Sequence, residues 1–170
     1  AAGSVPQGVI VLEADLCDAV AVDRLLGEYE PAAVYHLAAF HHSSQEPERS
    51  AALEAKEAMI RGNFLTTRTL AFALARRRSA AHLIFASSSQ IFSATSGVLR
   101  CDESTARNPA SFYGLCKSWS MDLLRFLRQE SGMRFSNAIL FNHESPHRAP
   151  RFVTRKISIA AARAKLGLPV

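Results

Sequence analysis

The sequence predicts an α/β fold, a doubly wound parallel sheet of the Rossmann-like type. Short apolar runs rich in β-branched residues alternate with longer segments of helical periodicity. Strands that alternate with helices are joined by crossover connections, so a parallel sheet is expected. In residues 139–157, an apolar run stops abruptly at Asn142-His143-Glu144-Ser145-Pro146 and basic residues follow. Polar clusters after strands are typical of ligand sites at the carboxyl edge of open α/β sheets.

Residue patterns indicate where each strand and helix lies. The run V-I-V-L-E at the start indicates a strand buried on both faces, and Asp18 can cap the helix that follows. The helix near residue 120 is indicated by an apolar stripe of Leu115, Trp119, Leu123, Leu124 and Leu127. The expected elements are strand Val9–Glu13, helix Asp18–Glu30, strand Ala33–Leu37, one or two helices over Glu48–Arg78, strand His82–Ala86, helix Ser111–Ser131, strand Arg134–Leu140 and helix Phe152–Leu166.

Length and composition restrict the class of protein. A chain of 170 residues with 48% hydrophobic and 21% charged residues fits one globular domain. The start lacks a signal-peptide pattern, no apolar run approaches the ~20 residues needed to cross a bilayer, and no membrane partner is expected. The cysteines Cys17, Cys101 and Cys116 form no CxxC pair, which favours reduced thiols in a cytoplasmic protein.

The net charge of +5 has two interpretations. It describes a solvated, Arg-rich surface, or it marks a site for an anionic ligand such as a nucleotide. Nucleic acid is not expected as a partner, because basic and aromatic residues do not interleave.

A Gly-rich turn is absent from the start of the chain. A doubly wound nucleotide-binding domain normally opens with a strand, a Gly-rich turn and a helix, whereas Gly3 and Gly8 here lack that spacing. We therefore expect residues 1–170 to form a partial nucleotide-binding domain without its first βαβ unit. No residues are left for a C-terminal substrate domain, so the chain is interpreted as the middle of a larger protein.

Tyr113 and Lys117 are the strongest catalytic candidates. They are four residues apart on a predicted helix and therefore share one face. An ammonium near a phenol favours the phenolate, so we expect a lowered pKa and an acid/base role for Tyr113. Accidental spacing on an amphipathic helix is the alternative.

Other candidates lie where predicted strands end. Ser87-Ser88-Ser89 could orient a substrate oxygen, or form a plain polar loop. Asp15-Leu16 could contact an adenine edge, or begin the next helix. Leu37-Ala38-Ala39 would let a flat cofactor approach the backbone, although a close-packed strand end has the same composition.

These motifs, in this order, resemble the extended short-chain dehydrogenase/reductase superfamily. The pattern is a strand with Asp-Leu, then H-L-A-A, A-S-S-S and Y-x-x-x-K. The later N-H-E-S-P, F-V-T-R-K-I and the tail 162–168 resemble the GDP-mannose 4,6-dehydratase family within it. The resemblance covers most of the chain from Glu13 and is loose between His42 and Asn63.

The resemblance implies a role for each matching residue. Tyr113 would be the acid/base, Lys117 would hold the nicotinamide ribose, and Ser88 would bond the sugar 4-hydroxyl. Asn142 would face the sugar nucleotide. Further contacts to the cofactor, NADP or alternatively NAD, would come from Asp15, Leu16, Leu37, Ala38, Ala39, Phe40, His41, His143 and Arg148. The implied substrate is a nucleotide sugar, GDP-mannose above all, and the full-length protein would be a homo-oligomer.

Position 90 departs from the family. The family reads A-S-T-S-E where this chain has A-S-S-S-Q at 86–90, and that glutamate serves elimination of water. Gln90 occupies a catalytic position but cannot accept a proton at neutral pH. The resemblance implies a dehydratase, with an epimerase or ketoreductase as one alternative and a non-catalytic fragment or degenerate homologue as the other. No metal is expected, because the histidines lack ligand spacing with carboxylate support.

Overall fold

The computed structural model describes residues 6–40, 53–92, 100–150 and 152–169. The chain divides into two compact units, Ala1–Ile139 and Leu140–Val170.

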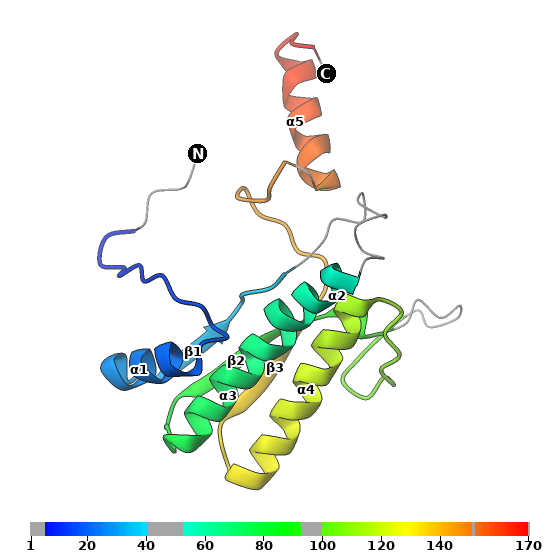
Figure 1. Cartoon of the computed structure of the whole chain (residues 1–170). Coiled ribbons are helices and arrows are strands. Elements are labelled where there is room, and N and C mark those ends of the chain that lie inside the picture. The colour runs from blue at the N-terminus through cyan, green and yellow to red at the C-terminus, as the bar shows by residue number, and fades with distance from the viewer. Residues whose placement is uncertain (1–5, 41–52, 93–99, 151, 170) are drawn as a thin grey trace. The chain divides into compact units, whose positions relative to one another are not determined.

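A three-stranded sheet forms the centre of the first unit (Figure 1). Its strands are β1 (Ala33–His36), β2 (His82–Ser88) and β3 (Phe135–Leu140), in the order β1-β2-β3. β1 and β2 are parallel, with Ala33 opposite His82 and His36 opposite Phe85. The central strand β2 contains Leu83 and Phe85, both fully buried, as its run of apolar residues predicts.

Helices cover one face of this sheet. Helix α1 (Ala19–Tyr29) begins at Asp18, whose side chain accepts hydrogen bonds from the Val20 and Ala21 amides. A continuous helical segment follows β1 and consists of α2 (Leu53–Met59), a π-helical turn η2 (Ile60–Leu65) and α3 (Thr66–Arg76). Helix α4 (Phe112–Ser131) lies beside α3 and against β2 (Figure 1). The short 3₁₀ turn η3 (Ser89–Ile91) directly follows β2.

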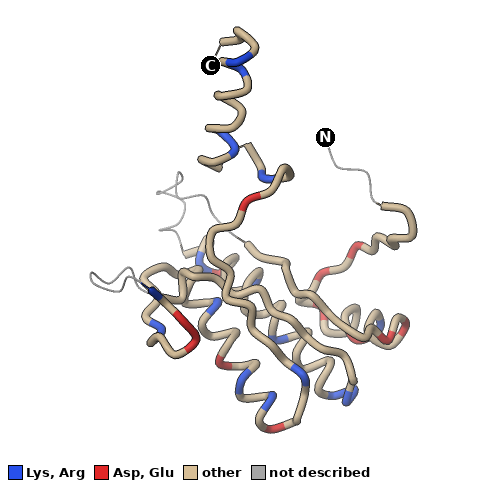
Figure 2. Tube along the Cα trace, turned by 180° about the vertical axis from the view of Figure 1, so that it is seen from behind, with Lys and Arg blue, Asp and Glu red and all other residues tan. Residues whose placement is uncertain are grey.

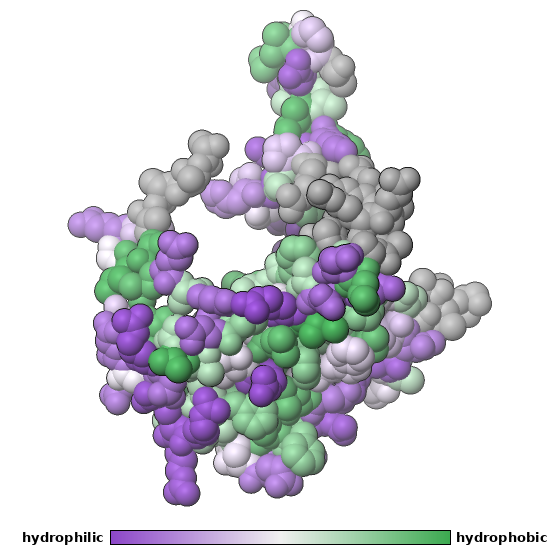
Figure 3. All heavy atoms as spheres, viewed as in Figure 1, coloured by the Kyte–Doolittle hydropathy of each residue, from purple (hydrophilic) through white to green (hydrophobic). Residues whose placement is uncertain are grey.

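The core lies between the sheet and helices α3 and α4. It is made of apolar side chains from the two helices, from strands β2 and β3 and from the segments just before these strands: Ala71, Leu74, Ala81, Leu83, Phe85, Leu124, Met133 and Phe135. A smaller cluster of Val22, Leu70 and Ala73 joins α1 to α3. Outside the core, the surface over α3 and α4 shows apolar patches between charged side chains (Figure 3). Phe72, Trp119 and Phe126 are 38–59% exposed.

The second unit contains helix α5 (Val153–Lys165), which begins after Phe152 and buries none of its residues. Its charged residues are all basic, as the blue segments along its trace show (Figure 2). Among the described residues, no helix is both long and apolar enough to cross a membrane.

The predicted strand Val9–Glu13 is wrong. These residues have no regular secondary structure, and Val9 to Leu12 are each at least 50% exposed. An apolar run becomes a strand only where a neighbouring strand satisfies its backbone groups, and no described strand lies beside this segment. The other predicted strands and helices are confirmed, with ends shifted by up to two residues. Residues 48–52 of the predicted long helix lie outside the described residues.

Candidate active site

The candidate site is built at the carboxyl ends of β1 and β2. Because these strands are parallel, the loops after His36 and after Ser88 emerge at the same edge of the sheet. Helix α4 starts next to η3 and presents Tyr113 and Lys117 in its first two turns. The fold therefore brings three of the predicted motifs to one edge.

Lys117 is buried beneath this edge, with 1% of its surface exposed. Its Nζ donates a hydrogen bond to the Ala86 carbonyl of β2 at 2.9 Å and lies 4.7 Å from the centroid of the Phe85 ring. Burial disfavours the ammonium and lowers the pKa of Lys117 to about 8. The lysine is thus anchored to the strand that ends in the serines.

Tyr113 lies one turn before Lys117, and the Lys117 Nζ is 5.5 Å from the centroid of its ring. The expected lowering of its pKa is wrong for this structure, because burial raises the pKa of the Tyr113 phenol. Desolvation of a phenolate outweighs the attraction of an ammonium that lies over the ring rather than beside the hydroxyl.

The first two of the three serines after Ala86 have different surroundings. Ser87 is buried, and its hydroxyl donates to the Met121 sulfur at 3.0 Å. Ser88 ends the strand, and its Oγ accepts a hydrogen bond from the backbone N–H of Gln90 at 3.2 Å. A hydroxyl that accepts a backbone N–H keeps its own proton for another partner, so Ser88 can still donate, whereas the Ser87 proton is directed to Met121.

Gln90 is exposed and contacts the start of α4. Its Oε1 accepts a hydrogen bond from the Ser111 hydroxyl at 2.8 Å. Ser111 in turn caps α4 by accepting the Gly114 amide at 3.0 Å. A Cβ at position 114 would lie 2.2 Å from the Gln90 carbonyl oxygen, so only glycine allows this approach.

Asn63 is a site residue that sequence reasoning missed. It is fully buried in η2, and its side-chain amide accepts from the Phe40 N–H at 3.2 Å and donates to the Phe40 carbonyl at 2.8 Å. The amide therefore fixes the loop of Leu37, Ala38, Ala39 and Phe40, all of which are exposed at the sheet edge. Gly62-Asn63 in the middle of a helical run was the available signal, since both residues are poor helix formers.

His36 is a second missed residue and lies below the same loop. It is buried, and its Nε2 is 3.0 Å from the Thr67 hydroxyl. Thr67 donates its own proton to the Asn63 carbonyl, so the imidazole N–H is assigned as the donor toward Thr67. Burial, with a contribution from the Lys117 charge, lowers the pKa of His36 to about 4, which keeps the imidazole neutral.

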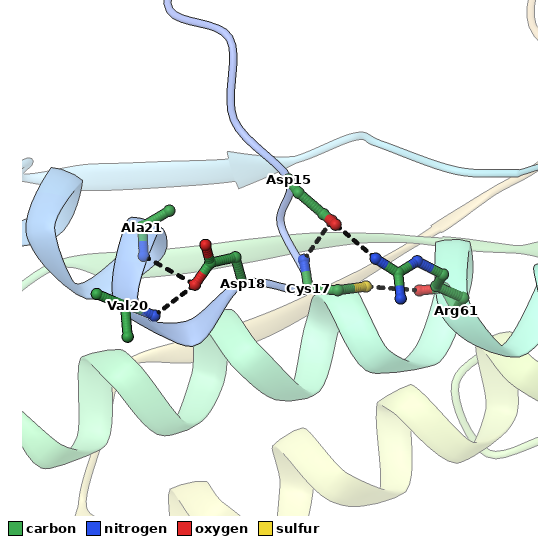
Figure 4. A network of polar contacts seen from close by, with 6 residues as sticks. All are labelled: Asp15, Cys17, Asp18, Val20, Ala21 and Arg61. Carbon is green, nitrogen blue, oxygen red and sulfur yellow. Dashed lines mark hydrogen bonds and ion pairs between the residues drawn. The ribbon is translucent and has the colours of Figure 1, made fainter.

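Asp15 lies before α1 and faces the π-helical turn (Figure 4). One of its oxygens accepts the Cys17 amide at 2.8 Å, and the other pairs with the Arg61 guanidinium. These hydrogen bonds and the Arg61 charge lower the pKa of Asp15. Helix capping, the alternative role for this segment, belongs to Asp18 (Figure 4).

The C-terminal candidates belong to the second unit. Asn142 and His143 are exposed, and His143 Nδ1 lies 2.9 Å from the Phe141 carbonyl. The guanidinium carbon of Arg148 lies 3.7 Å from the centroid of the Phe152 ring, and the guanidinium forms an ion pair with Glu144. Arg148 also lines a pocket with Ser145, Pro146, Thr154, Arg155 and Ser158. His41 lies outside the described residues.

Comparison with known proteins decides the family. The sequence profile of GDP-mannose 4,6 dehydratase matches residues 3–169. The chain belongs to the GDP-mannose 4,6-dehydratase family.

Two relatives show how much of a family member the chain represents. It is 33% identical to the GDP-mannose 4,6-dehydratase of Yersinia enterocolitica over 162 residues, which are 91% of this chain and 40% of that protein. It is 34% identical to GDP-mannose 4,6 dehydratase 1 of Arabidopsis thaliana, with 91% and 42% covered. The chain thus spans well under half the length of the relatives it matches.

Solved structures confirm the Rossmann-like fold. The UDP-glucose 4-epimerase of Thermus thermophilus, in complex with NAD, superposes with a TM-score of 0.78 at 26% identity and covers 98% of this chain and 51% of its own. RMD from Pseudomonas aeruginosa, complexed with NADPH, gives a TM-score of 0.80 at 24% identity, with 95% and 52% covered.

The first unit of this GDP-mannose 4,6-dehydratase family member brings together the central part of the predicted site. Ser88, Gln90, Tyr113 and Lys117 are connected through β2, η3 and the first turns of α4, and the loop 37–40 lies at the same edge. The roles assigned to these residues, and to Asp15, Leu16, Asn142, His143 and Arg148, stay predictions.

Proposed function

We propose that this chain is the central part of a nucleotide-sugar enzyme that oxidises its substrate at C4 of the sugar. The observation that supports it most is the anchoring of Lys117 to Ala86, which holds the Tyr113 helix beside the strand that ends in Ser88. Membership of the GDP-mannose 4,6-dehydratase family makes GDP-mannose the first substrate to test. A cytoplasmic location and a homo-oligomeric full-length protein belong to the same proposal.

The residues at the sheet edge suit a nicotinamide dinucleotide, with NADP preferred. Lys117 has three N–H donors, of which one is directed to Ala86, and an ammonium is a suitable donor to ribose hydroxyls. The small residues Ala38 and Ala39 in the fixed loop leave room for a flat ring beside the backbone. When bound, the dinucleotide would supply the hydride acceptor for C4.

The proton steps are assigned to side chains of this chain. Ser88 would donate to the sugar 4-oxygen and orient it, and Tyr113 would remove the 4-hydroxyl proton as C4 is oxidised. Because burial raises the pKa of Tyr113, this role needs the Lys117 charge to stabilise the phenolate once substrate is in place.

Gln90 leaves the later steps open and favours a second candidate function. An amide cannot shuttle the protons that elimination of water requires, and this amide accepts a hydrogen bond from Ser111. A nucleotide-sugar 4-epimerase needs only oxidation at C4 followed by return of the hydride to the opposite face, and a ketoreductase needs only the reduction at C4. A third possibility, a non-catalytic homologue, predicts no hydride transfer at all.

The test is turnover of GDP-mannose by the full-length protein with NADP, followed by the mass of the product. Tyr113→Phe should abolish hydride transfer, whereas Tyr35→Phe, at an exposed tyrosine of β1, should not. A product that has lost water establishes a dehydratase, and a product of unchanged mass with inverted C4 establishes an epimerase. Full turnover in Tyr113→Phe would refute the proposal.

A further inference from the structure

Gln90 contacts both the end of β2 and the start of α4. Its backbone N–H donates to Ser88 Oγ, its backbone carbonyl packs on the Cα of Gly114, and its side-chain oxygen accepts from Ser111. An exposed glutamine usually makes few fixed contacts, so this convergence calls for an explanation.

The Ser111 hydroxyl transmits the contact to the helix. It donates its single proton to Gln90 Oε1 and accepts the Gly114 N–H, so the same oxygen has a defined donor and a defined acceptor. Without an acceptor at position 90, the hydroxyl could rotate or turn to water, and the cap on Gly114 would lose its orientation. Gln90 therefore fixes the orientation of the Ser111 hydroxyl, which caps the helix.

Tyr113 lies between two attachments of α4 to β2. One is the Gln90–Ser111 pair at the helix start, and the other is the Lys117–Ala86 hydrogen bond, one turn after Tyr113. A helical turn held at both ends to the strand that carries Ser88 cannot move Tyr113 independently of Ser88. The distance between an acid/base and the residue that orients its substrate is the kind of geometry to which reaction rates are most sensitive.

We infer that Gln90 and Ser111 act together as positioning residues, which hold the first turn of α4, and with it Tyr113, against the end of β2. This inference rests on the proposed function, because it concerns the geometry of the same site. It gives Gln90 a structural task in the oxidation step, separate from the elimination step that a glutamine cannot perform.

The experiment measures the rate of hydride transfer from the sugar in a single turnover of the full-length protein. Gln90→Ala and Ser111→Ala should each slow it roughly tenfold or more, the order expected for a misplaced catalytic group. The double variant should be no slower than the slower single variant, since both remove one shared interaction. NADPH affinity, followed by fluorescence, should be unchanged in all three.

Rescue and control variants separate positioning from a loss of stability. Ser111→Thr keeps a capping hydroxyl and should recover most of the rate that Ser111→Ala loses. Ser131→Ala removes a hydroxyl from the far end of the same helix, where it donates to Leu127, and should leave the rate unchanged. A wild-type rate in Gln90→Ala, or fully additive effects in the double variant, would overturn the inference.

A second readout does not depend on turnover. The hydrogen-exchange rate of the Gly114 amide should rise in Gln90→Ala as well as in Ser111→Ala, although Gln90 does not itself bond that amide. If the wild-type protein transfers no hydride, the proposed function fails, and this exchange rate alone decides the inference. Wild-type exchange in Gln90→Ala would then overturn it.

Discussion

Lys117 shows how a single residue can serve a site at the expense of stability. It is one of the largest fully buried side chains, and its ammonium has one hydrogen bond to a carbonyl and two aromatic rings nearby. A buried charge with so few partners costs free energy of folding, and the lowered pKa of Lys117 expresses that cost.

The stability cost of Lys117 is predicted to depend on pH. The pKa is about 8 in the folded chain and 10.5 when exposed, so between these values the unfolded chain binds a proton that the folded chain does not. Stability should therefore rise with pH through this window, and below about pH 8 the full cost, roughly 3 kcal/mol, is present.

Lys117→Met removes that charge while keeping the length of the side chain. The variant should be more stable than wild type in urea unfolding near neutral pH, and the difference should shrink as the pH approaches 10.5. Lys165→Met, at an exposed lysine of α5, should show no such trend. A constant difference across the pH range would contradict the assignment of the cost to the buried ammonium.

At the scale of elements, the ends of two helices contain backbone conformations that favour glycine. Glu30 after α1 and Arg78 after α3 have positive φ values of 39° and 48°. A side chain in this region is strained by roughly 1 kcal/mol or more relative to glycine. Gly132 after α4 has a similar positive φ of 67°, which a glycine adopts without this strain.

Arg78→Gly is accordingly predicted to stabilise the protein by about 0.5–1 kcal/mol. Arg78 makes its backbone hydrogen bond to Ala75 through its N–H, which glycine keeps. Arg76→Gly, two residues earlier at the last position of α3, should destabilise by up to about 1 kcal/mol because it loosens the helix. Thermal or urea unfolding of both variants checks the pair, and a destabilising Arg78→Gly would contradict the strain argument.

Helices and strands were predicted correctly where the hydrophobic pattern of the segment matched a layer that it packs against in the fold. The stripe of α4 and the apolar run of β2 specify their structure because each has a layer to pack against. Val9–Glu13 carries an equally apolar run, but it is exposed and has no regular secondary structure. Periodicity also could not reveal the π-helical turn at Ile60–Leu65, in which Asn63 bonds Phe40 of a distant segment.

At the scale of the whole first unit, Asn63 joins segments that are far apart in the sequence. Its side chain binds the loop after β1, and its carbonyl accepts from Thr67 and from Ser120 of α4. Asn63 therefore links two parts of the predicted site. One is the loop expected to hold the cofactor, and the other is the helix expected to hold the catalytic pair.

Asn63→Ala should destabilise the protein by about 2–3 kcal/mol, because the part-buried backbone groups of Phe40 and the buried Met59 carbonyl lose their hydrogen bonds to the Asn63 side chain. It should also weaken NADPH binding by the full-length protein, since the loop 37–40 loses its fixed position. Asn137→Ala is the matched control: its Oδ1 accepts no hydrogen bond within the described structure, so a small effect is expected. Equal effects of the two substitutions in urea unfolding would contradict the account.

The sequence by itself determined the α/β alternation, most element ranges and the motifs after β2 and on α4, because periodicity and spacing are local properties of the chain. It also carried the family resemblance that the profile match bears out. Only the tertiary structure decided that Ser87 is buried against Met121, that Tyr113 is harder to ionise than an exposed phenol, and that Gln90 bonds Ser111. Burial and hydrogen bonding between distant segments set these properties, and neither is a function of spacing along the chain.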